Sequence, residues 1–224
     1  MGQGVAEVLT FAVGVAVSPL PVIAVILILF SRQANLNGRA FLAGWTVGLA
    51  VVGGIAYAIA AGADANSDAT ASDSMSWLKI VLGVVLLWLA ARRWRTRPAP
   101  GAATEPPKWM ARVESLRPGQ AAGLGALLVV ANPKNLILTI GAAVGLAQLG
   151  LSTGDVVVAL IVFIVVASAS IAAPVIYHRR GGARAETTLD NVKAWLVEND
   201  ATVMAVLFLV FGVDLIAKGI GLLS

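Results

Sequence analysis

ALLVVANPKNLILTIGA, residues 126–142, is an apolar stretch that Asn132-Pro133-Lys134-Asn135 interrupts near its centre. It lies within a hydrophobic run over 119–149, which is long enough to cross a bilayer. Proline removes a backbone hydrogen bond from a helix, and hydrocarbon offers no partner to the freed carbonyls. The stretch therefore predicts a discontinuous membrane helix whose break lies against protein or a watery cavity.

A second break, Ser18-Pro19-Leu20-Pro21, lies inside the run 5–30. The two breaks occupy corresponding positions in the two halves of the chain. Matched interruptions of this kind are typical of transporters whose binding site lies near the bilayer midplane, at the interface of two repeats. We therefore expect the two breaks to meet inside the molecule.

The composition excludes an ordinary soluble domain, because the chain is 58% hydrophobic and only 12% charged. Its 224 residues predict a single membrane domain. The sequence contains no cysteine, so it has no disulfide and no thiolate metal site. Six hydrophobic runs are candidate spans: 5–30, 40–62, 75–91, 119–149, 155–177 and 201–223.

Basic residues separate the linkers between these runs into two classes. Thirteen of the 16 lysines and arginines lie in the linkers after the first, third and fifth runs. The positive-inside rule places these three linkers in the cytoplasm. Both termini are then predicted to lie outside, in a multi-pass protein of the bacterial cytoplasmic membrane.

The matched breaks, the span count and the charge pattern together predict an all-α membrane protein with a 3+3 inverted repeat. The first repeat covers residues 1–95 and the second covers 118–224, with a basic cytoplasmic linker over 96–117. Within the second repeat, apolar residues at helical spacing predict an amphipathic helix near 186–197 at the membrane interface. The alternative for that segment is an early start of the sixth span.

The residues of both breaks resemble the motifs of a known family. Asn132-Pro133-Lys134 in the fourth of six spans resembles a motif of the lysine exporter (LysE) superfamily, and Ser18-Pro19-Leu20-Pro21 resembles its first-span proline motif. The basic, proline-containing central linker and the overall length are more similar to the GAP branch, which includes the sulfolipid-addressing and peptidoglycolipid-addressing proteins. The resemblance implies a six-helix transporter of amino acids or cell-envelope glycolipids. Leu20 replaces a glycine that is common in the amino-acid exporters, which weakens the amino-acid interpretation.

Lys134 is the strongest candidate for chemistry, because a charge at the bilayer centre normally faces the bundle interior or water. Its ammonium and the freed N–H groups of a half-helix would suit a carboxylate, phosphate or sulfate. Alternatively, Lys134 pairs with Asp214 or caps the carbonyls of a broken helix. Asp214 is either a coupling carboxylate, a counter-ion of Lys134, or the i,i+4 partner of Lys218.

The predicted substrate-binding residues are the polar and proline residues of both breaks: Ser18, Pro19, Pro21, Asn132, Pro133, Lys134 and Asn135. The chain has no phosphate-binding loop, zinc-protease motif or nucleophile elbow, so no enzymatic activity is expected. With one histidine, neither a metal site nor a cofactor is predicted.

The favoured function, which rests on the family resemblance, is the movement of a cell-envelope glycolipid with an anionic or polar headgroup across or out of the cytoplasmic membrane. The first alternative is a proton-coupled exporter of an amino acid or another small metabolite. The second is a non-transporting membrane partner of a lipid synthase or exporter. The expected partners are membrane lipids and such biosynthetic or export proteins, and no nucleic acid.

Overall fold

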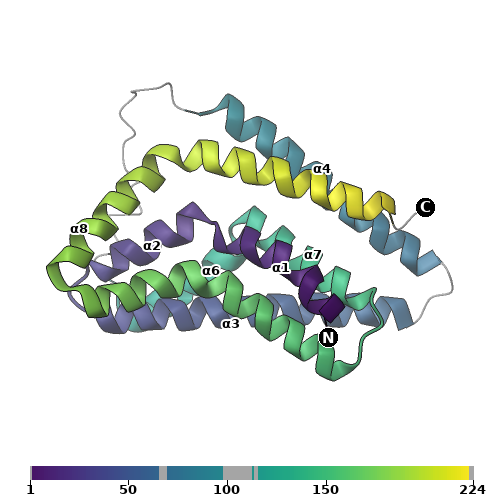
Figure 1. The fold of residues 1–224 in the computed structure, drawn as a ribbon, viewed down its shortest axis with the longest axis horizontal. Coiled ribbons are helices and arrows are strands. Elements are labelled where there is room, and N and C mark those ends of the chain that lie inside the picture. The colour runs from purple at the N-terminus through teal and green to yellow at the C-terminus, as the bar shows by residue number, and fades with distance from the viewer. Residues whose placement is uncertain (1, 66–69, 98–112, 114–115, 222–224) are drawn as a thin grey trace.

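The computed structural model describes residues 2–65, 70–97, 113 and 116–221, and its regular elements there are all helices (Figure 1). α8 contains one break, at Gly182, whose φ of 50° suits glycine. The helices are α1 (Gly2–Ala16), α2 (Pro19–Leu29), α3 (Ala34–Ala65), α4 (Thr70–Arg95), α6 (Pro118–Val130), α7 (Pro133–Ala147) and α8 (Thr153–Gly221).

Three helices are long and apolar enough to span a membrane: Ala34–Gly62, Thr153–Gly182 and Arg184–Gly221. Two further spans arise if each bent pair counts as one, with α1 and α2 bent by 56° and α6 and α7 by 69°. α4 is the sixth candidate, and it packs along the second half of α8. The prediction of an all-helical multi-pass membrane protein with discontinuous first and fourth helices is thereby confirmed.

The prolines begin the second helix of each bent pair. Pro19 opens α2 and Pro133 opens α7, where the missing N–H of proline costs nothing because the first turn has no acceptor for it. Ser18 and Asn132 precede these prolines with extended backbones. The Asn132 side chain caps α7 by accepting a hydrogen bond from the Lys134 N–H at 3.1 Å.

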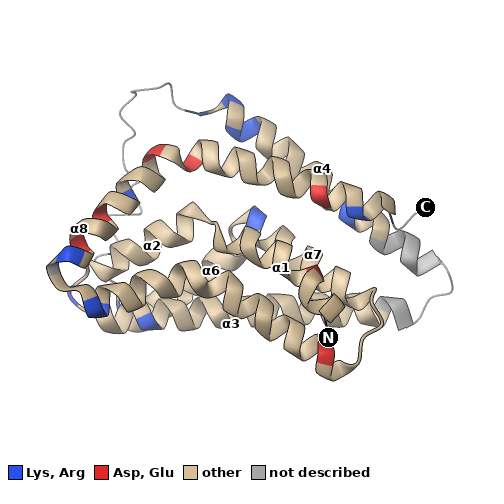
Figure 2. Ribbon diagram, viewed as in Figure 1, with Lys and Arg blue, Asp and Glu red and all other residues tan. Residues whose placement is uncertain are grey.

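The bundle has two distinct ends. What we call the basic end holds the turn between α2 and α3, the break at Gly182 and the last turn of α4, and Lys and Arg gather there (Figure 2). The terminal end holds the start of α1 and the last turns of α7 and α8, so the first and last described residues, Gly2 and Gly221, lie toward it (Figure 1). That the basic end faces the cytoplasm stays a prediction.

Each bent pair packs against a helix from the other half of the chain. α3 lies along α6 and α7, while α8 lies along α1 and α2. This packing of each half against the bent pair of the other half is consistent with an inverted repeat. The division into repeats at 1–95 and 118–224 stays a prediction. Most of the predicted linker over 96–117 lies outside the described residues.

The segment 186–197 is helical, but the structure does not separate it from the last span. It forms the beginning of the helix Arg184–Gly221, as the alternative of an early start anticipated. Leu189 is buried, whereas Val192 and Trp195 are exposed. Its predicted place at the membrane interface is not tested by the fold.

Candidate functional site

The first break leaves main-chain carbonyls of α1 without helical partners. Pro21 has no N–H to offer Val17, and the N–H of Ser18 bonds to the Ala16 carbonyl at 2.9 Å instead of to Gly14. The carbonyls of Gly14 and Val17 therefore need donors from elsewhere in the protein.

Lys134 supplies those donors. Its side chain is 0% exposed, and its Nζ donates to the carbonyl of Gly14 and, at 2.8 Å, to that of Val17. Among the alternatives from the sequence, this contact is the cap of a broken helix rather than a pair with Asp214. A lysine from the second break thus stabilises the first.

A second hydrogen bond joins the two breaks directly. Ser18 Oγ donates to Asn135 Oδ1 at 2.6 Å, and both residues are buried. Asn135 also receives a hydrogen bond at its main-chain oxygen from Thr139 Oγ1, at 2.7 Å. The two breaks therefore lie against each other, as the matched motifs predicted.

A pocket of about 430 Å³ opens beside these breaks, on the side of the basic end. We call it the basic-end pocket. Of the predicted substrate-binding residues, Asn132 and Pro133 line it, whereas Ser18, Lys134 and Asn135 are buried behind it. Its lining residues are Leu20, Leu89, Arg92, Arg93, Thr96, Ala131, Asn132, Pro133, Asp200, Met204 and Phe208.

The two arginines of this pocket are held differently. Arg93 forms an ion pair with Asp200 at 3.5 Å across α4 and α8, and both side chains are partly exposed. Arg92 lies over the ring of Trp88, 5.6 Å from its centroid. Sequence analysis placed these arginines in a basic linker and assigned them no site. Only the packing of α4 against α8 brings them to the breaks.

A second, almost wholly apolar pocket of about 310 Å³ lies between α3, α4 and α7. We call it the lateral groove. Ile55 and Ile59 on its wall are 56% and 67% exposed, so the groove opens on the side of the bundle. It is lined by Val52, Ile55, Ala56, Ile59, Ala60, Leu78, Ile140 and Val144.

A third pocket of about 290 Å³ lies at the terminal end, and four charged residues gather at it or beside it. We call these residues the terminal cluster: Glu7, Lys79, Asp214 and Lys218. Lys218 Nζ lies 3.4 Å from Asp214 and 3.7 Å from Glu7, so Asp214 has the i,i+4 partner that the sequence offered. Sequence reasoning missed Glu7 and Lys79. The sequence did carry a signal for both residues, because each is a charged residue inside an apolar run, Glu7 in 5–30 and Lys79 in 75–91.

Among the described residues, no group of three or more His, Cys, Asp or Glu side chains has the arrangement to hold a metal ion. The polar groups near the breaks are amides, hydroxyls and basic side chains, together with one carboxylate, Asp200, which is paired with Arg93. With the carboxylate already paired, the basic side chains and the amide N–H groups suit anions and hydroxyls.

Comparison with protein families gives a match that covers nearly the whole chain. Residues 8–221 match the model described as "Sap, sulfolipid-1-addressing protein". Searches of curated proteins and of solved structures gave no match. The resemblance to the sulfolipid-addressing branch is thereby confirmed. This multi-pass membrane protein belongs to the sulfolipid-1-addressing protein family.

Proposed function

We propose that this protein moves a cell-envelope glycolipid with an anionic or polar headgroup across or out of the cytoplasmic membrane. The observation that carries the proposal is the basic-end pocket, which places two arginines and an apolar wall beside the paired helix breaks. The name of the family, which refers to a sulfolipid, supports a lipid cargo with an anionic group.

The headgroup is assigned to the polar side of the basic-end pocket. A guanidinium matches the oxygens of a sulfate or phosphate with paired hydrogen bonds, and within the described residues Arg92 forms no ion pair with a carboxylate. Arg93 is shared with Asp200, so an anion there competes with that carboxylate. Asn132 adds an amide at the break itself.

The acyl chains are assigned to apolar surfaces. Leu20, Leu89 and Phe208 form an apolar wall in the basic-end pocket, and the lateral groove opens on the side of the bundle that faces lipid. A lipid keeps its tail in the bilayer while its headgroup crosses. A lateral opening therefore suits a lipid cargo, whereas a small amino acid does not need one. The remaining break residues, Lys134 and Ser18 among them, act by holding the breaks together.

The complete burial of Lys134 also favours a second candidate, a non-transporting membrane partner of a lipid synthase or exporter. A transporter must rearrange around its breaks, whereas a docking protein can keep Lys134 permanently bonded to α1. The two candidates differ in what the isolated protein does. Purified protein in liposomes moves lipid between leaflets in the first case and does not in the second.

The test is leaflet exchange of a fluorescent sulfated glycolipid in such liposomes. Arg92→Ala and Arg93→Ala are each expected to reduce the rate by about tenfold, because each removes charge-assisted hydrogen bonds. Arg95→Ala is the matched control, since Arg95 is in the same turn of α4 but does not line the pocket. Equal rates for all three variants would refute the assignment of the headgroup site. No exchange by the unsubstituted protein would favour the non-transporting partner.

A further inference from the structure

The third pocket, which we call the terminal-end pocket, has a wall of charged, amide and apolar groups. Its volume of about 290 Å³ is at the small end of the range for ligand pockets, so it suits one small group rather than a whole lipid. No step of the proposed function uses it. It is lined by Glu7, Lys79, Gly145, Gln148, Leu149, Lys218 and Gly221.

Gln148 gives the strongest sign that this pocket binds a ligand. It is the C-cap of α7, and its side-chain Nε2 and Oε1 are both buried without a hydrogen-bond partner among the described residues. An orphaned amide inside a protein is costly, because its donor and its acceptor have both lost their bonds to water. A pocket wall that carries this cost is suited to bonding with a molecule that enters the pocket.

Two ionic groups of the wall also have bonding capacity left. Glu7 Oε1 is buried without a hydrogen bond to a described residue, and it meets Lys218 Nζ only as an ion pair at 3.7 Å. Lys79 is 3% exposed, and it forms no ion pair with a carboxylate of the described residues. The pocket thus offers an acceptor at Glu7, a donor at Lys79 and one of each at Gln148.

The charge of the terminal cluster selects the class of ligand. Its two carboxylates and two ammoniums cancel, so the cluster as a whole attracts neither sign of charge. Lys218 Nζ lies 3.7 Å from Glu7 and 3.4 Å from Asp214, so an added cation would have to compete with it for both carboxylates. An added anion would gain from Lys79 but would be repelled by the same two carboxylates. A hydroxyl avoids both costs, because it donates and accepts hydrogen bonds without carrying a charge.

The terminal-end pocket lies at the far end of the helices that form the basic-end pocket. α7 begins in the basic-end pocket with Pro133, and its C-cap Gln148 lies in the terminal-end pocket. On α8, Asp200 lines the first pocket and Lys218 the second. The helical rise puts these two residues about 27 Å apart, close to the thickness of a bilayer core.

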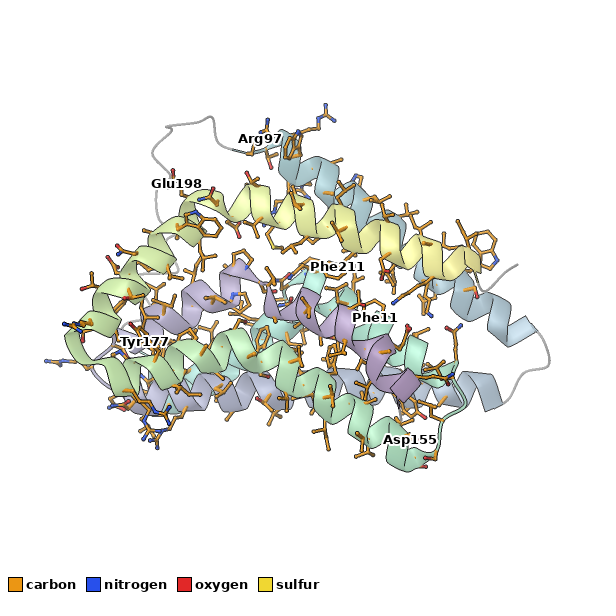
Figure 3. The ribbon with its side chains drawn as sticks, viewed as in Figure 1. Phe11, Arg97, Asp155, Tyr177, Glu198 and Phe211 are labelled. Carbon is orange, nitrogen blue, oxygen red and sulfur yellow. The ribbon has the colours of Figure 1, made fainter. Side chains whose placement is uncertain are left out.

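An apolar layer separates the two pockets, so they are distinct sites in this conformation. Phe11 and Phe211 lie in the middle of the bundle (Figure 3). Together with Leu138 and Leu215 they are at most 6% exposed. A Cβ on Gly14 would collide with Phe211 and Leu138, so the layer is tightly packed.

We infer that the terminal-end pocket is a second binding site, which takes an uncharged group rich in hydroxyls, such as a single sugar ring. The hydroxyls of this group donate to Glu7 Oε1 and Gln148 Oε1, and they accept from Lys79 Nζ and Gln148 Nε2. That the ring belongs to the headgroup of a transported lipid rests on the proposed function. On that basis the headgroup occupies the basic-end pocket on one side of the bilayer core and the terminal-end pocket on the other.

The test is protection of a thiol by ligand in this cysteine-free chain, held in lipid nanodiscs without sugar detergent. Leu149→Cys places the thiol on the pocket wall at a position that is 38% exposed, and Thr153→Cys is an exposed reference outside the wall. The probes are hexyl glucoside, hexyl sulfate and hexyl phosphocholine, which share an alkyl chain and differ in the charge of the headgroup. At about four times its Kd, hexyl glucoside should slow maleimide modification of Leu149→Cys by about fivefold and leave the reference unchanged. The two charged probes should protect much less.

Gln148→Met, added to the reporter, removes the amide at nearly constant size. Protection by hexyl glucoside should be lost, and the melting temperature without any probe should rise, because an orphaned buried amide is gone. This rise distinguishes a binding role of Gln148 from a structural one. Gln33→Met, at an exposed glutamine of the basic end, is the control and should change neither measurement.

The inference is overturned by absent protection, by equal protection from all three probes, or by protection that persists in Gln148→Met. Stronger protection by hexyl sulfate or by hexyl phosphocholine also overturns it, in favour of an anion or a zwitterion. So does a lower melting temperature of Gln148→Met, since the amide then serves the fold. Absent protection with normal lipid exchange in liposomes rejects the second site alone, whereas protection without exchange rejects only the transport proposal.

Discussion

At the scale of single residues, side chains of the second break supply hydrogen bonds to the first break. Lys134 and Asn135 of α7 both bond to the first break, the lysine through the carbonyls of Gly14 and Val17 and the amide through Ser18. These buried contacts replace the helical hydrogen bonds that the prolines remove. Lys134 therefore acts in this conformation as a donor to main chain rather than as a free cation.

Lys134→Ala should strand both carbonyls and lower the free energy of unfolding by about 3 kcal/mol, because unsatisfied buried acceptors keep their full desolvation penalty. The measurement is thermal unfolding in detergent, with Lys193→Ala as the control at a partly exposed lysine that pairs within its own helix. Unchanged stability together with lost lipid exchange would instead support the predicted role of Lys134 in substrate binding.

At the scale of helices, small residues decide how closely the two halves approach. Gly125 of α6 lies against the main chain of Phe41 and Trp45 in α3, and a Cβ there would collide with the Phe41 carbonyl. Gly44 of α3 meets the Ala122 carbonyl in the same way. In a membrane, such close contact between helices supplies the packing energy that the hydrophobic effect does not.

Gly125→Ala should therefore destabilise the protein by about 2 kcal/mol, since backbone cannot move aside as a side chain can. Gly123→Ala is the matched control two residues away, because a Cβ at Gly123 meets nothing within 4 Å. The control should be neutral or slightly stabilising, as alanine favours helix over glycine. Thermal unfolding of both variants decides the matter, and equal melting temperatures would contradict the close α3–α6 contact.

At the scale of the whole molecule, the two ends differ in charge and in the pockets that they hold. The basic end carries exposed arginines, whereas the terminal end holds a charge-balanced cluster. Arg97 and Asp155 lie at opposite ends of the bundle (Figure 3). The positive-inside rule then predicts that Arg97 faces the cytoplasm and that the region of Asp155 faces outward.

Labelling of single cysteines in intact cells tests this orientation. A membrane-impermeant reagent should modify Thr153→Cys and leave Arg97→Cys unmodified until the cells are opened. The absence of native cysteine makes the background low. The reverse pattern would place the basic end outside and would contradict the predicted orientation.

The sequence by itself determined the membrane class, the positions of the breaks and the family, because hydropathy and the effect of proline act over a few neighbouring residues. It left the contacts of Lys134 and Asp214 open among several partners. Only the tertiary structure shows these contacts, with the α1 carbonyls beside Lys134 and Lys218 beside Asp214. It alone revealed Glu7 with Lys79, and Arg92 at the breaks, because the helices that bring them together are far apart in the chain and no local pattern records such contacts.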